Sequence, residues 1–215
     1  MAFQSKTEGI AVVHPANIIR AVFQIRGTAP FVQNKFSAKQ KALMMENMAT
    51  PKAAQKAKSA RKPRDYDADF KNAQHVSTAG WNGIPCPAFR AAMIDACRAA
   101  GLVMTKAKMS VFVIPDGFDV DEGTPLVRII SPTPPERLES LVRNDNGGAD
   151  IHIRPMWRDW SANVTVEFDA DMITVESVVN LLDRAGRQVG VGEGRPFSKN
   201  SVGQGWGTFT VVTSE

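Results

Sequence analysis

The sequence predicts an α+β protein with a ferredoxin-like or RRM-like core. Two segments, 18–26 and 162–168, alternate apolar and polar residues, as strands half-buried on a core do. Two others, 87–100 and 174–185, carry apolar residues at helical spacing. With two further strands the order is strand, helix, strand, strand, helix, strand, which is the ferredoxin-like order. The six expected elements are 18–27, 87–100, 109–114, 160–169, 174–185 and 206–213.

The first strand and first helix have clear boundaries. Ala21, Phe23 and Ile25 share one face of the strand, which a Gly-Thr-Ala-Pro turn ends. Pro87 suits the first turn of the helix, where its missing N–H costs nothing, and Gly101 suits its end. Thr174 is an expected cap of the second helix. We expect one core, formed by Phe89, Met93, Val164, Val166, Leu182 and Phe209.

Two insertions interrupt these elements in what we expect to be one domain, 1–215. Insertion 31–86 contains helix-forming residues over 36–60, broken at Pro51. Insertion 115–157 is expected to be β-rich, with a strand at 126–131, an Asn-Asp-Asn-Gly-Gly turn within 142–149 and a short strand at 150–154.

Positive charge is concentrated in the first insertion. Residues 35–64 hold nine lysines and arginines against one glutamate, a charge of +8. Because the whole chain carries +4, the remainder carries −4. Such asymmetry indicates a polyanionic partner, although a solvated linker has the same composition.

A glycine-rich loop lies between the second helix and the last strand. Segment 189–211 holds six glycines in two G-x-G-x-G runs, together with Arg195 and Lys199. Main-chain N–H groups in such loops form anion-binding nests. The loop therefore predicts contact with a phosphate backbone, although a glycine-rich connection between elements would look the same.

Three stretches together resemble the RAMP superfamily, the RNA-binding subunits of CRISPR effector complexes. The glycine loop after a helix ending in Ala185-Gly186 is similar to that family's C-terminal signature. FQIRGTAPF at 23–31 resembles its first strand and G-T-x-P turn. IPCPAFRAAMIDACR at 84–98 resembles the entry to its first helix, with Cys86-Pro87-Ala88 in place of small hydroxyl residues. The run 154–196 also resembles phage proteins.

This resemblance implies a RAMP-like fold, RNA as the ligand and self-association along one strand. Some RAMP subunits cleave RNA with one aspartate in the loop where Asp65, Asp67 and Asp69 lie. The residues themselves fit an acidic helix start, with Asp65 as the cap. We therefore expect a binding protein and not an enzyme.

A cation–aromatic group, Arg154, Trp157, Arg158 and Trp160, leaves two interpretations open. Such groups stack on bases and hold phosphates, or they form cation–π packing contacts.

Other chemistry finds no support in the sequence. Phosphate-loop, zinc-protease, G-x-S-x-G and C-x-x-C motifs are absent, so we expect no cofactor and no metal. There is no apolar run of membrane-spanning length, no secretory signal and no disulfide framework in the two cysteines. We expect a cytoplasmic location, in a bacterium or a phage-infected cell.

The predicted function is therefore binding of single-stranded nucleic acid. The resemblance implies that the nucleic acid is RNA and that the protein acts in a homo-oligomer or a RAMP-type complex. The alternatives are a phage counter-defence protein that mimics a protein partner and one that sequesters a small nucleotide. The predicted binding residues are Lys52, Lys56, Lys58, Arg61, Lys62, Arg64, Arg154, Trp157, Arg158, Gly192, Gly194, Arg195, Lys199, Gly203, Gly205 and Trp206.

Overall fold

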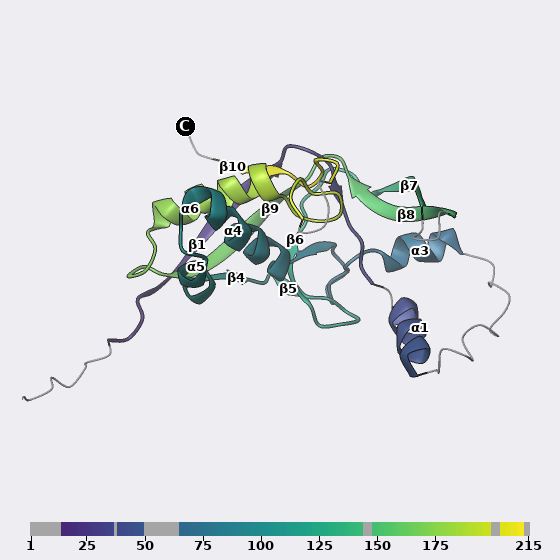
Figure 1. Ribbon diagram of the computed structural model, residues 1–215, viewed down its shortest axis with the longest axis horizontal. Helices are drawn as coiled ribbons and strands as arrows, with labels where there is room; N and C mark the ends of the chain where they lie inside the picture. Colours follow the sequence, from purple (N-terminus) through teal and green to yellow (C-terminus); the bar gives the residue numbers. More distant parts are fainter. Residues whose placement is uncertain (1–13, 37, 50–64, 144–147, 199–202, 213–215) are drawn as a thin grey trace, which may run out of the picture.

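The structure is a computed structural model that describes residues 14–36, 38–49, 65–143, 148–198 and 203–212. It is a mixed α+β protein with antiparallel sheets (Figure 1). Its strands are β1 (Ile18–Gly27), β2 (Phe31–Val32), β3 (Gly83–Pro85), β4 (Val111–Ile114), β5 (Gly117–Phe118), β6 (Pro125–Arg128), β7 (Glu136–Arg143), β8 (Ala149–Trp157), β9 (Ser161–Asp169) and β10 (Phe209–Val211). Its helices are α1 (Ala38–Ala49), α3 (Tyr66–Asn72), α4 (Cys86–Ala100), α5 (Met104–Ser110), α6 (Val175–Arg184) and the π-helical turn η1 (Ala185–Val189).

A four-stranded antiparallel sheet in the order β10-β1-β9-β4 forms the largest layer. β1 and β9 pair along nearly their whole length, with Phe23 opposite Val164 and Ile25 opposite Ala162. The alternation predicted for these strands is confirmed, because Ala162, Val164, Val166 and Phe168 are buried while Asn163 is exposed.

The helices α4 and α6 lie together on one side of this sheet in Figure 1. All six predicted core side chains are buried in one cluster beneath them: Phe89, Met93, Val164, Val166, Leu182 and Phe209. The rings of Phe89 and Phe209 meet edge to face with centroids 5.7 Å apart. Thr174 caps α6 and Gly101 ends α4 in the left-handed conformation, as predicted.

The two insertions form two further three-stranded sheets, β2-β8-β7 and β3-β6-β5. The β7–β8 hairpin and α3 lie at the opposite end of the molecule from α6 (Figure 1). The hairpin brings Leu141 opposite Ile151, and both side chains are exposed. Strand β7 has no counterpart among the predicted elements.

Four predicted strands were wrong in extent. The strand expected at 126–131 is β6, which ends at Arg128, and the one expected at 150–154 is part of the longer β8. Met109 and Ser110 belong to α5, because Val103 to Ser110 continues the helical hydrogen bonds and β4 begins only at Val111. The last strand, predicted from residue 206, begins at Phe209, because Trp206 and Gly207 form a turn in which Gly207 has a φ of +67°.

Candidate nucleic-acid interface

The glycine-rich loop folds back on the body of the protein. Its backbone is tied at both ends, by a 2.9 Å hydrogen bond from Val191 N to Gly207 O and a 2.9 Å bond from Glu193 N to Val32 O. Gly192 has a φ of +83°, and a Cβ there would lie 2.5 Å from the Val32 carbonyl oxygen. Only glycine therefore allows the loop to lie so close to β2.

A pocket of about 480 Å³ opens between this loop, the end of β2 and the start of α4. Its walls carry Asn34, His75, Ala88, Arg195 and Ser198, together with the backbone of 192–194. The α4 N-terminus has no side-chain cap, so its first N–H groups keep the partial positive charge of a helix start. The pocket thus combines several features suited to an anion.

Some main-chain donors of the loop are satisfied internally, and others remain available. The amides of Val191, Glu193, Gln204, Trp206 and Gly207 all donate to carbonyl oxygens of the chain. Those of Gly192, Gly194 and Arg195, which line the pocket, meet no acceptor among the described residues. Many N–H groups of this glycine-rich loop are therefore not free to bind an anion, but the three at the pocket are.

Arg195 is the main cation at the pocket. Glu193 also lines the pocket, but its carboxylate accepts a 2.7 Å hydrogen bond from Arg154. Arg195 donates to the Gly192 carbonyl at 3.2 Å and has no carboxylate partner among the residues the structure describes. The paired Arg154 and Glu193 cancel, so Arg195 is the cation that remains on this side of the pocket.

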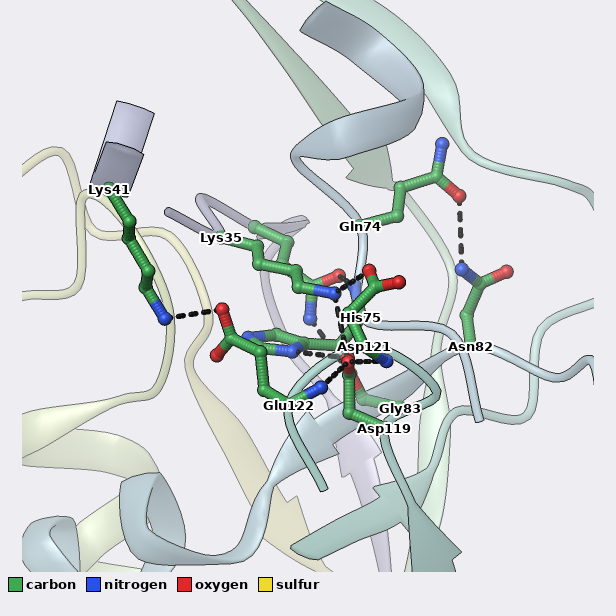
Figure 2. A network of polar contacts seen from close by, with 10 residues as sticks. Lys35, Lys41, Gln74, His75, Asn82, Gly83, Asp119, Asp121 and Glu122 are labelled. Carbon is green, nitrogen blue, oxygen red and sulfur yellow. Dashed lines mark hydrogen bonds and ion pairs between the residues drawn. The ribbon is translucent and has the colours of Figure 1, made fainter. Parts of the chain in front are cut away.

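A buried polar network, shown in Figure 2, fixes the opposite wall of the pocket. The Asp119 carboxylate is fully buried and accepts hydrogen bonds from Lys35 Nζ at 2.9 Å and from two backbone amides, Asp121 N and Glu122 N. His75 Nδ1 lies 2.8 Å from the other Asp119 oxygen. Because Asp119 holds Nδ1, His75 can turn only Nε2 toward the pocket.

The charges of this network stabilise one another. Burial disfavours the charged form of Asp119, but hydrogen bonds from Lys35 and His75 outweigh it and hold the carboxyl pKa below its usual value. Burial likewise opposes the charged form of Lys35, and hydrogen bonds to Asp121 and Asp119 outweigh it and raise the amine pKa. Lys35 is thus a structural cation, and it is not available to a ligand.

Cys86 at the start of α4 supplies no nucleophile. Burial, with a contribution from the Asp116 carboxylate, raises the pKa of its thiol to about 12. The thiol therefore stays protonated near neutral pH.

The cation–aromatic group resolves mainly into packing contacts. Trp157 was wrongly predicted to stack on bases, because its ring is buried against Phe31 with centroids 5.5 Å apart. Trp160 is buried as well and donates Nε1–H to Ala29 O. Arg158 is exposed but pairs with Glu136 at 2.8 Å.

The remaining predicted binding residues differ in their exposure and in their position relative to the pocket. Trp206 is partly exposed beside Gly194, so it stays a candidate for stacking. Gly203 and Gly205 are exposed and do not line the pocket, although Gly203 lies against the backbone of Gly194 and Arg195, which do. Lys199 and the six basic residues between 52 and 64 lie outside the described residues.

The three aspartates form a helix start, as their spacing predicted. Asp65 caps α3 by accepting hydrogen bonds from Asp67 N and Ala68 N. Asp67 also pairs with Arg137 of β7 at 2.9 Å.

The sequence reasoning missed Asn34, His75 and the Lys35–Asp119 pair. Lys35 and Asp119 alone are 84 positions apart, and these residues follow no motif, so periodicity could not group them. Within the described part of the chain, no three His, Cys, Asp or Glu residues are grouped to hold a metal ion. No helix there has the length and apolarity to cross a bilayer.

No protein-family model matches this chain, and no curated protein shows significant sequence similarity to it. The geometry of the site must therefore carry any functional argument.

Proposed function

We propose that this protein binds single-stranded nucleic acid through the phosphate backbone. Its RAMP-like sequence stretches favour RNA as the ligand. The observation that carries the proposal is the pocket where the glycine loop, the uncapped start of α4 and Arg195 meet. Unpaired N–H groups at a loop and a helix start bind phosphate oxygens, and a guanidinium adds charge and geometry.

The arrangement of the central sheet supports a ferredoxin-like, RAMP-like core. Along the chain β1, α4, β4, β9, α6 and β10 give the strand, helix, strand, strand, helix, strand sequence, and β10-β1-β9-β4 is the antiparallel order expected of it. In this proposal, copies of the protein assemble along one strand of nucleic acid.

The basic insertion carries the larger share of the affinity in this proposal. Lys35 and Lys41 are excluded from that role, because Lys35 pairs with Asp119 and Lys41 pairs with Glu122. Of the seven cations that remain in residues 35–64, the six from Lys52 to Arg64 form the group that follows the phosphate backbone. Replacing all six with Gln should reduce the slope of log K against log salt by about 3 to 4.

Sequestration of a small nucleotide is a second candidate. The pocket volume of about 480 Å³ lies within the range of small-molecule sites. In that case affinity would be independent of oligonucleotide length, whereas backbone binding gives an affinity that grows with length.

The proposal is tested by titrating labelled oligouridylates of 4 to 24 nucleotides at several salt concentrations. The variant Arg195→Gln should weaken binding and reduce the salt slope by about 0.7, the contribution of one phosphate contact on a single strand. The matched control is Arg98→Gln, which removes the same charge from the exposed last turn of α4. Equal behaviour of the two variants, or no binding of any length at low salt, would contradict the proposal.

A further inference from the structure

A second pocket, of about 610 Å³, lies where the β3-β6-β5 sheet meets the outer face of β9. Trp81, Asp116, Arg128 and Asn163 all line it. Asn163 belongs to the exposed face of β9 and lies opposite Gln24 of β1. The pocket therefore opens onto the face of the large sheet opposite the one that packs against α4 and α6.

Trp81 lies across the small sheet on two glycines. A Cβ at Gly117 would be 2.8 Å from the six-membered ring of the indole, and one at Gly83 would be 3.0 Å from it. Any larger residue at either position would displace the ring. The two glycines thus let the indole lie against the strands, in a fixed position.

This tryptophan differs from the buried tryptophans of the core. Trp160 is buried and its Nε1–H donates to a carbonyl oxygen. Trp81 is partly exposed, and its Nε1–H meets no acceptor among the described residues. A partly exposed, firmly seated indole provides a stacking surface for a base.

The polar groups around Trp81 are held in place but can still form further hydrogen bonds. Asp116 is held by a 2.8 Å hydrogen bond from the Arg128 backbone N–H to Oδ2, and Oδ1 has no partner in the described chain. The guanidinium of Arg128 is exposed and forms no ion pair with a described residue. On the adjoining sheet face Arg26 is likewise exposed and unpaired within the described residues.

We propose that this pocket holds one unstacked guanine base of the bound strand. The base stacks on Trp81, its Watson–Crick edge meets Asp116, and Arg128 and Arg26 contact the flanking phosphates. Guanine is favoured because its N1–H and N2–H₂ present adjacent donors to a carboxylate, which accepts and cannot donate. Adenine, cytosine and uracil each have only one donor group at that edge, and the position next to it is a ring nitrogen or carbonyl acceptor, so none of them can bind both carboxylate oxygens. The inference rests on the proposed binding of single strands and adds a base preference that phosphate contacts alone do not give.

The test compares GMP, AMP, CMP and UMP by quenching of tryptophan fluorescence, since Trp157 and Trp160 are buried and the accessible signal comes from Trp81 and Trp206. Twelve-residue oligouridylates with and without one central guanosine are measured beside them. GMP should quench most, and the single guanosine should strengthen binding about 10- to 150-fold, the range of a hydrogen bond to a charged group.

The key variant is Asp116→Asn, which keeps an oxygen acceptor for the Arg128 N–H but removes the charge. It should abolish the guanosine preference and leave binding of plain oligouridylate unchanged. Glu176→Gln, which removes a carboxylate from the exposed first turn of α6, is the control and should change neither. Trp81→Leu should weaken guanosine binding roughly 5- to 150-fold, and Trp81→Phe should restore part of it. If a Trp81 variant does not fold, Arg128→Gln tests the site instead, because it removes a proposed contact with a flanking phosphate.

The outcomes separate the two proposals. Equal binding of the four nucleotides, or a guanosine preference that survives in Asp116→Asn, would overturn the guanine site while oligouridylate binding could still stand. If oligouridylate does not bind but GMP binds in a manner that depends on Trp81 and Asp116, the guanine site holds and backbone binding fails.

Discussion

The helix-covered sheet and the region around Asp119 are stabilised in different ways. Beneath α4 and α6 the buried side chains are apolar and include Phe89, Val166 and Phe209. Around β2, β3 and β5 the buried side chains include Gln33, Lys35, Ser77 and Asp119. The first region depends on packed volume, whereas the second depends on charge and on complete hydrogen bonding.

This difference bears on the candidate interface, because the pocket lies between the two regions. The helix α4 supplies one wall from the apolar core, and His75 supplies another from the polar network. The polar wall is held by the hydrogen bonds that the Asp119 carboxylate accepts. Changes to the apolar region should therefore alter overall stability, and changes to the polar region should also alter the pocket.

The largest expected effect comes from Phe89→Ala. Phe89 is fully buried and touches Phe209, so its removal leaves a cavity in the core. We expect a loss of roughly 3–5 kcal/mol in the free energy of unfolding, measured by urea denaturation. A loss under about 1 kcal/mol would show that the two aromatic rings do not anchor the core.

Next in size is Asp119→Asn, which leaves Lys35 buried with only the Asp121 carboxylate beside it. Removing one partner of a buried pair is strongly destabilising, and we expect about 3 kcal/mol here. Unlike Phe89→Ala, it should also weaken oligonucleotide binding to the folded protein, because the Asn oxygen is needed by Lys35 and two backbone N–H groups and His75 then faces an amide NH2 group instead of a carboxylate. Asp171→Asn, an exposed site, is the control and should do neither.

A smaller effect should follow from acidification. Because the pKa of folded Asp119 lies below its ordinary value of 3.8, its stabilising contribution is present above that value and is lost as pH falls through the lower folded pKa. The pKa of folded Lys35 lies above its ordinary value of 10.5, so the stabilising contribution of Lys35 is fully present below pH 10.5. That contribution is lost as pH rises through the raised pKa of the folded state. Thermal melts from pH 2 to 6 should show a shallower acid decline in Asp119→Asn than in the unmodified protein. Identical declines would mean that other carboxylates govern acid unfolding.

The smallest effect is expected at the surface ion pair of the sheet. Arg20 and Glu167 lie opposite each other at 2.8 Å, but the Arg20 side chain is 60% exposed. Solvent and salt screen such a pair, so Glu167→Gln should cost no more than about 0.2–1 kcal/mol in urea denaturation. A loss comparable to that of Asp119→Asn would contradict the distinction between buried and exposed charges.

Much of the central sheet followed from local patterns. The alternation in 18–26 and 162–168 gave the correct elements and buried faces, and the helical spacing in 87–100 and 174–185 gave the correct elements and most of the buried side chains, although Val175 of α6 is exposed. These patterns work because one face of each element meets an apolar core, which selects side chains with the period of the backbone. The start of the strand expected at 109–114 was wrong, since Met109 and Ser110 continue the helix α5 and β4 begins only at Val111.

The sequence by itself determined the α+β character, the faces of the main helices and strands, the Asp65 cap and the concentration of charge in the first insertion. Only the tertiary structure decided which cations and aromatic rings remain available. Arg154, Arg158 and Lys35 find carboxylate partners far along the chain, and Trp157 finds the ring of Phe31. Such contacts join residues with no common period, because burial and charge pairing depend on distances in space that local spacing does not encode. The same reason explains why the position of Trp81 against the distant Gly117 became recognisable only once the three strands of its sheet had been brought together.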